Sequence, residues 1–248
     1  ILVATTHHFN RVSSYLSDTL LTPIVKNLIT ISSLPLKGVE TDFAVDSSGF
    51  STSRFVRWYN KKWGREIDNR EWVKVHLMCG VNTHIVTAVD TSGWAANDTT
   101  YFKPLVEQTA QHFQIAEVSA DKAYSSHKNH EIVASIGATP FIPFKVNTLM
   151  PKEESTWAKM YHYFMFKREA FLQHYHKRSN VETVFSMIKG KFGDAVRSKS
   201  DTGMVNEVLC KVLCHNICVL IQAIHEFGIE PIFRAEMPVA RELASFGQ

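Results

Sequence analysis

The sequence predicts an α/β fold, a mixed five-stranded sheet with helices on both faces. Three segments with the alternation of strands follow one another between residues 41 and 91. After them, helical and strand-like segments alternate up to residue 143, and the rest is mainly helical. Three antiparallel strands followed by alternating helices and strands are typical of such a sheet. With 248 residues, 45 % of them hydrophobic, the chain can bury a core of this size.

The N-terminal residues 1–40 are interpreted as a helical segment, the remnant of a DNA-binding region or a brace on the core. Pro23 interrupts a helical period in residues 1–31, so we expect two short helices or one kinked helix. Residues 32–38, SSLPLKG, have the composition of a linker. The chain begins with Ile, and we expect the natural N-terminus to lie upstream. The expected buried side consists of Tyr15, Leu16, Leu20, Leu21, Ile24, Val25 and Leu28.

The first predicted strand, residues 41–48, carries Asp46, and an acid on a central strand is costly unless it is ligated or at the surface. Gly49 is expected to open a hairpin-like excursion in which cations alternate with aromatic residues. Cations suit phosphates and aromatic faces suit bases, so the segment predicts a nucleic-acid groove. A basic surface hairpin with aromatics tucked beneath it is the alternative. The residues expected to contact DNA here are Arg54, Arg57, Trp58, Lys61 and Lys62.

The remaining elements complete a domain of residues 41–228, followed by a tail of residues 229–248 without a usable signal. A fourth strand ends at Asp121, and helix 97–113 has Asp98 as its expected cap. The expected strands are 72–79, 84–91, 115–120 and 139–143, and the expected helices are 97–113, 125–136, 152–175, 174–192 and 203–227.

Residues 174–192 read as an amphipathic helix with a second set of residues beside its apolar stripe. Tyr175, Arg178, Glu182 and Lys189 fall within a sector of roughly 60° at 3.6 residues per turn. One carboxylate is thus flanked by two cations and a phenol, as a helix that binds a metal ion and a phosphodiester requires. A solvated face with an Arg178–Glu182 pair is the alternative for the helix alone.

Asp46, Asp121 and Glu182 would meet if the first and fourth strands are neighbours and helix 174–192 crosses them. Three carboxylates so close repel one another unless cations lie between them. Two Mg²⁺ ions roughly 3.5–4 Å apart would suit oxygen ligands and could act on both the attacking and the leaving oxygen of a phosphodiester. We expect Mn²⁺ to be able to substitute.

From about residue 39 to residue 227 the chain resembles the DDE transposases of bacterial insertion sequences, whose core is ribonuclease H-like. The resemblance rests on AVDSSGF around Asp46, REWVKVHL, SADKAYSS around Asp121, and the signature Tyr-x2-Arg-x3-Glu-x6-Lys. Tyr175, Arg178, Glu182 and Lys189 meet that signature. It implies that Asp46, Asp121 and Glu182 carry the metals and that Arg178 and Lys189 hold phosphates, with Tyr175 in support. No strand-rich insertion is expected before Glu182.

The resemblance implies cleavage at transposon ends and transfer of a 3′-OH into double-stranded target DNA, by a homodimer that holds two ends. The alternatives are a metal-dependent nuclease of the same fold and an inactive DNA-binding protein. Residues 145–199 carry eleven Lys and Arg against five Asp and Glu, while the whole chain is only +3, and this unevenness favours a polyanionic partner.

The other features favour a cytoplasmic enzyme without further metal sites. Four cysteines without the spacing of a disulfide framework, and no expected signal peptide, fit a reducing compartment. No apolar run is expected to be long enough to span a membrane. Asp90, at an expected strand end, and Asp98 are weak metal candidates. Lys122 could reach DNA or be a plain surface lysine, and His174 and His176 are expected to face DNA or solvent. Cys210, Cys214 and Cys218, with His215 nearby, are interpreted as a buried thiol face and not as a zinc site.

Overall fold

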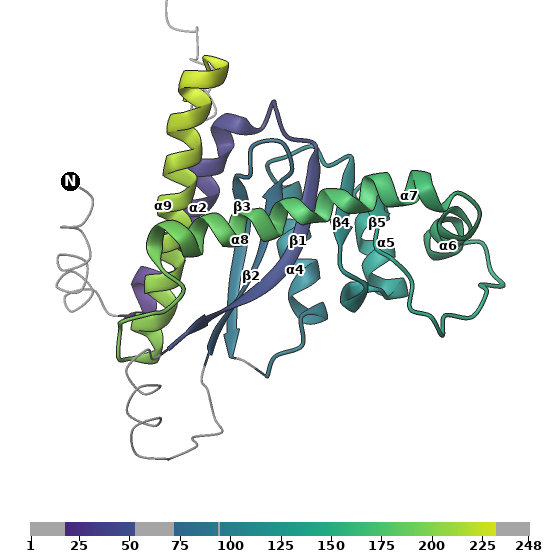
Figure 1. Ribbon diagram of the computed structural model, residues 1–248, viewed down its shortest axis with the longest axis horizontal. Coiled ribbons are helices and arrows are strands. Elements are labelled where there is room, and N and C mark those ends of the chain that lie inside the picture. Colours follow the sequence, from purple (N-terminus) through teal and green to yellow (C-terminus); the bar gives the residue numbers. More distant parts are fainter. Residues whose placement is uncertain (1–17, 53–71, 94, 232–248) are drawn as a thin grey trace, which may run out of the picture.

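The computed structural model describes residues 18–52, 72–93 and 95–231. A five-stranded sheet in the order β3-β2-β1-β4-β5 lies at its centre (Figure 1). β2 runs antiparallel to both β1 and β3, whereas β4 pairs in parallel with β1 and β5 in parallel with β4. The mixed sheet, with β1 and β4 side by side, is as expected from the sequence. The strands are β1 (Asp42–Ser51), β2 (Trp72–Gly80), β3 (Val86–Gly93), β4 (Glu117–Ala120) and β5 (Thr139–Phe141).

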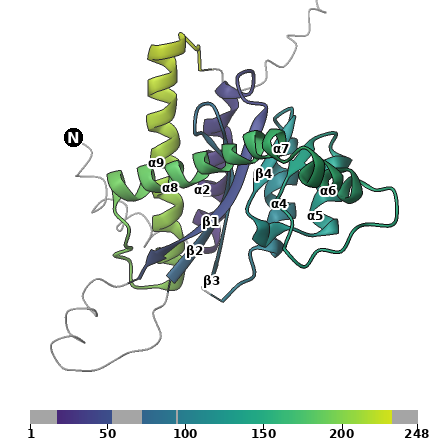
Figure 2. The ribbon, with the colours of Figure 1, turned by 45° about the vertical axis from the view of Figure 1, so that its right-hand side comes forward.

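Helices cover both faces of this sheet (Figures 1 and 2). α4 and α5 pack on one face, α8 and α9 pack on the other with α2 beside α9, and α6 and α7 lie near β5. The helices are α2 (Asp18–Ser33), α4 (Thr99–Ala110), α5 (His127–Ser135), α6 (Thr156–Phe166), α7 (Arg168–Tyr175), α8 (Ser179–Phe192) and α9 (Asp201–Phe227). Short 3₁₀ helices are η2 (Leu34–Leu36), η3 (Lys122–Tyr124) and η4 (His176–Arg178).

Alternation along β1 divides the core into two layers. Phe43 and Val45 are buried with the residues of α4 and α5, whereas Ala44 and Phe50 are buried with those of α8 and α9. Asp46 shares the parity of Ala44, so the strand presents it to the α8 face. The position of this acid beneath α8 thus follows from the strand period alone.

β1 is longer than expected, and Gly49 does not open a hairpin. The pairing with β2 continues through Gly49–Lys74 to Ser51–Trp72, and Ser51 also forms a bridge with Ala195. These pairs hold the glycine in extended backbone. Residues 53–71, with the expected DNA contacts Arg54, Arg57, Trp58, Lys61 and Lys62, lie outside the described residues.

α2 runs past Pro23 as one helix, and only part of its expected buried side is buried. Leu21 and Val25 are buried against α9 and the sheet, but Leu20, Ile24 and Leu28 are 42 to 57 % exposed. The reason is that α9 and β3 cover only one edge of the helix. Tyr15 and Leu16 lie outside the described residues.

The linker expected at residues 32–38 is wrong. Ser32 and Ser33 end α2, and their hydroxyls each donate to a carbonyl three residues back, at 2.7 Å, which satisfies them inside a helix. Leu36 of η2 is then fully buried with Ile85 and the end of α9. α2 therefore braces the core, while the division of the chain at residues 40 and 228 stays a prediction.

The helical region before α8 is divided into more pieces than the sequence indicated. Residues 152–175 contain two helices, α6 and α7, which meet at Lys167. The helix expected at residues 174–192 takes in the end of α7, the 3₁₀ turn η4 and α8. Between β5 and α8 the structure contains no strand, so no strand-rich insertion precedes Glu182.

α9 corrects the expectation that no apolar run could span a membrane. Its 27 residues are long and apolar enough by length and composition. However, it is a core helix, because buried polar side chains tie it to its neighbours. Asn216 bonds the backbone of Val86 and Ile29, and the His215 ring lies 2.9 Å from the carbonyl of His84.

Candidate active site

The parallel pairing of β1 and β4 brings Asp46 and Asp121 together. Val45 pairs with Ala120, the last residue of β4, and the two acids are the next residues on each strand. The charge of Asp121 acts on Asp46. Asp121 also accepts a hydrogen bond of 2.5 Å from the backbone N–H of Lys122, an exposed residue at the start of η3. The two acids expected at the sheet centre therefore are neighbours.

Arg178 joins the sheet to α8. Its Nη1 donates to Oδ2 of Asp46 at 2.7 Å, and its Nη2 donates to Oε1 of Glu182 at 2.5 Å. The pair with Glu182 is the i,i+4 contact expected on a helix. The bond to Asp46 crosses from the helix to β1 and is not available to a helix surface alone. One guanidinium thus links two of the three expected catalytic acids.

Asp46 is held in an environment that disfavours its charge. Burial raises its pKa, the N–H of Ser47 (2.8 Å) and the charge of Arg178 lower it, and the charges of Asp121 and Glu182 raise it again. The net result is a raised pKa. A partly buried acid beside two like charges needs a nearby cation, which Arg178 supplies here.

The three acids have the chemistry of ligands for a divalent metal. In the described parts of the chain, no group of three His, Cys, Asp or Glu residues is placed to hold an ion. Arg178 forms ion pairs with two of the three acids, Asp46 and Glu182. Carboxylate oxygens without His or Cys are the ligands of Mg²⁺ and Mn²⁺. Asp46, Asp121 and Glu182 as metal ligands therefore stay a prediction.

Lys189 and Tyr175 lie at opposite ends of this site. The ammonium of Lys189 donates to Oγ of Ser48 at 2.7 Å and lies 5.3 Å from the centre of the Phe50 ring, and burial lowers its pKa. The Tyr175 ring has the Arg178 guanidinium 6.0 Å from its centre. The structure hence arranges the four signature residues along α7, η4 and α8, with β1 beneath them.

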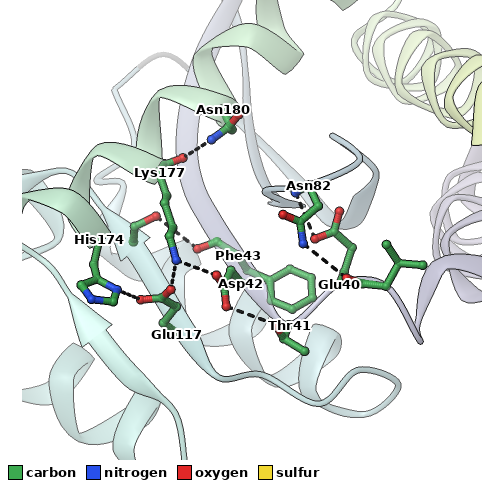
Figure 3. Close-up of polar contacts among 11 residues, drawn as sticks. Glu40, Thr41, Asp42, Phe43, Asn82, Glu117, His174, Lys177 and Asn180 are labelled. Atoms are coloured by element: carbon green, nitrogen blue, oxygen red, sulfur yellow. Dashed lines mark hydrogen bonds and ion pairs between the residues drawn. The ribbon is translucent and has the colours of Figure 1, made fainter.

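A network that sequence reasoning missed anchors η4 beside the site (Figure 3). Lys177 donates to Oδ2 of Asp42 at 2.7 Å and also to Glu117, the first residues of β1 and β4. Burial raises the pKa of Asp42, but the hydrogen bonds with Lys177, Glu117 and Thr41 and the charge of Lys177 together leave the pKa lowered. Nδ1 of His174 lies 2.6 Å from Glu117, and its ring stacks on Phe141.

This network has two consequences. His174, expected to face DNA or solvent, packs on Phe141 and bonds Glu117 but keeps 40 % of its side chain exposed, and His176 is exposed. Lys177 and Arg178, consecutive in η4, bind β1 at residues 42 and 46, roughly 13 Å apart at the rise of a strand. The sequence signal that could have indicated this network is an acid at the start of each of two parallel strands, Asp42 and Glu117, followed later by the spacing His-x-x-Lys.

The weaker acidic candidates have other partners. Asp90 lies within β3, not at a strand end entering a turn, and pairs with Lys26 at 2.7 Å. Asp98 occupies the N-cap position of α4 without a capping bond from its side chain, which pairs with Lys74 and lies 3.5 Å from His76. The prediction that the Asp98 side chain caps α4 is therefore wrong, because its carboxylate pairs with Lys74 on β2 instead.

The cysteines of α9 form neither a zinc site nor a fully buried face. Cys210, Cys214 and Cys218 are free and only partly buried. His215 lies about 100° around the helix from the middle of the cysteine stripe, where it is buried and bonded to the carbonyl of His84. The prediction of a buried thiol face is therefore wrong, since Ile221, on the same stripe, is 53 % exposed.

Comparison with known proteins agrees with this geometry. A family model described as a transposase DDE domain matches residues 37–217, which include all five strands and the three acids. A search of curated proteins found no match.

Proposed function

We propose that this chain, which belongs to the family of transposases with a DDE domain, cleaves DNA at transposon ends and joins the freed 3′-OH to target DNA. Family membership makes it an enzyme that acts on DNA, with transposase-type nuclease and strand-transfer chemistry. The observation that carries the finer proposal is the Arg178 link between Asp46 and Glu182, above the junction of β1 and β4.

In the first step, water attacks the phosphodiester at the end of the element. The bond between phosphorus and the 3′ oxygen breaks, leaving a 3′-OH on the element and a 5′-phosphate on the flanking strand. In the second step, that 3′-OH attacks a target phosphodiester and displaces its 3′ oxygen. Both are in-line phosphoryl transfers, in which positioning and charge neutralisation supply most of the catalysis.

Asp46, Asp121 and Glu182 would hold magnesium ions, with manganese able to replace them, and the ions would act as Lewis acids on the phosphate oxygens. Arg178 and Lys189 would bind phosphates on the two sides of the scissile bond, and Tyr175 would support Arg178. Arg178 and Lys189 are eleven positions apart, which spans about 16 Å of helix, roughly five base-pair steps of DNA. That span suits a clamp along one strand.

The proposed partners are the two transposon ends and a target duplex, bound by a homodimer in a bacterial cytoplasm. Two ends must be joined in a coordinated way, which is the reason for a dimer. Residues 1–40 would contribute to DNA binding, and the basic residues Arg54, Arg57, Lys61 and Lys62, with the aromatic Trp58, would extend the groove.

The test uses a labelled duplex made from the DNA that flanks the gene, with Mg²⁺ and a target plasmid. Transposase activity predicts a nicked end followed by joined product, and Asp46→Asn, Asp121→Asn or Glu182→Gln should each abolish both. Nicking without joined product would indicate a nuclease, and binding without nicking an inactive DNA-binding protein. If any one of these three variants cuts at the normal rate, the catalytic role assigned to the substituted acid is refuted.

A further inference from the structure

β1 has an open edge beside the active site. β4 ends at Ala120, opposite Val45, so among the described strands only β2 pairs with β1 from Asp46 onward, until Ser51 forms its bridge with Ala195. A hollow of about 530 Å³ lies along this stretch. It is lined by Ser47, Ser48, Gly49, Trp72, Lys74 and Lys189.

Trp72 lies close against the strand in this hollow. A Cβ atom on Gly49 would come within 3.0 Å of Cε3 of Trp72, so the glycine permits the ring to approach the backbone. The indole nevertheless remains 38 % exposed. Covering Gly49 accounts for the inner side of the ring, and in the described part of the chain no contact accounts for the exposed side.

The hollow has one cation suited to phosphate. Lys74 is engaged by Asp98 and by the carbonyl of Ala96. Lys189, by contrast, contacts the neutral hydroxyl of Ser48 at 2.7 Å. Because Ser48 is two strand residues beyond Asp46, Lys189 contacts β1 roughly 7 Å along the strand from that acid, about two steps of 3.4 Å along a DNA strand.

We propose that this hollow is a nucleotide subsite next to the cleaved phosphate, in which Trp72 stacks on one base of an unpaired strand and Lys189 binds its phosphate. The ligand class is single-stranded DNA of any sequence, since every base has a face that can stack on an aromatic ring. The subsite rests on the proposed function, because it serves the strand held at Asp46.

The test compares two fluorescein-labelled octamers by anisotropy in excess chelator, so that neither is cut. One is oligo(dT), and the other has the same phosphates with abasic sugars at all positions. Trp72→Ala should weaken oligo(dT) binding about 5- to 150-fold, the range of one base–aromatic stack, and leave the abasic octamer unchanged. Lys189→Ala should weaken both octamers, because it removes a phosphate contact.

Three further variants separate stacking from folding. Trp72→Phe should keep most of the affinity for oligo(dT), while Trp72→Leu, which still covers Gly49, should lose it. Phe166→Ala removes another exposed aromatic ring (80 % exposed, on α6) and should change neither octamer. Equal effects of Trp72→Leu on both octamers, or no effect on either, would overturn the subsite.

The nicking assay keeps the two proposals apart. If Asp46→Asn nicks at the normal rate while the Trp72 difference between the octamers holds, the cleavage site is wrong and the subsite stands. If nicking depends on Asp46 but Trp72→Leu binds oligo(dT) normally, only the subsite is overturned.

Discussion

Arg178→Met tests whether the guanidinium holds the acids together in the absence of metal. The substitution keeps an unbranched side chain and removes the charge and both hydrogen bonds. Asp46 would lose its cation while its own side chain remains only 21 % exposed. Glu182, at 57 % exposure, would lose a contact that water can replace.

The cost can be worked out from these exposures. A charge-assisted hydrogen bond in a partly buried place contributes about 1.5–3 kcal/mol, and an exposed i,i+4 pair contributes about 0.3–0.5 kcal/mol. The free energy of unfolding should therefore fall by about 2–3 kcal/mol. For a chain of this size that corresponds to a fall in Tm of about 4–12 °C, measured by calorimetry in chelator.

Magnesium should then stabilise the variant more than it stabilises the wild type. In the wild type an ion competes with Arg178 for Asp46 and Glu182, whereas in the variant it meets carboxylates without a partner. A tenfold tighter Kd would add about 1.4 kcal/mol of stabilisation at saturating Mg²⁺, or about 3–5 °C in Tm. The measurement is the Tm difference between 10 mM MgCl₂ and chelator for each protein.

Arg168→Met is the matched control. The Arg168 guanidinium lies over the Phe164 ring at 4.7 Å, so its loss should cost at most about 1 kcal/mol and should not change the response to Mg²⁺. An Arg178→Met protein as stable as the wild type, or with the same response to Mg²⁺, would refute the role assigned to the guanidinium. If Arg178 also binds phosphate, the salt dependence of DNA affinity should flatten by about one unit of slope, and an unchanged slope would refute the clamp.

Three further predictions concern stability. Burial lowers the pKa of His130 to about 4, so on acidification the unfolded chain binds a proton at this histidine before the folded protein does. Stability should therefore fall as the pH drops from 6.5 toward 4. His130→Gln should flatten the fall of Tm over that interval, and an equal slope in the two proteins would contradict this. Lys177→Met should lower the free energy of unfolding in urea by about 2–4 kcal/mol, with Lys177→Arg recovering most of it, because two strand-end acids lose their cation. Gly80→Ala should cost about 2–4 kcal/mol by the same assay, since the new methyl would lie 2.6 Å from Oε1 of the buried Glu40; a cost below 0.5 kcal/mol would mean that Glu40 moves freely.

Local periodicity predicted which segments are strands and helices, because it depends only on the alternation of near neighbours. It located Asp46 on the first strand, Asp121 at the end of the fourth and Glu182 on a helix that follows them, whereas the pairing of those two strands is a property of the fold. It failed where a distant segment sets the outcome. Leu20 is exposed and Leu36 is buried because of where α9 lies, and residue spacing carries no such information.

Residue identity and spacing alone were enough to predict the order of the elements, the family and the four signature residues. Only the tertiary structure decided which charges meet. Arg178 could pair with Glu182 on any helix, but its bond to Asp46 requires α8 to cross β1. Lys177 meets Asp42 across 135 residues because parallel strands place their first residues at one edge of the sheet. Coulomb energy depends on distance in space, and the fold sets that distance.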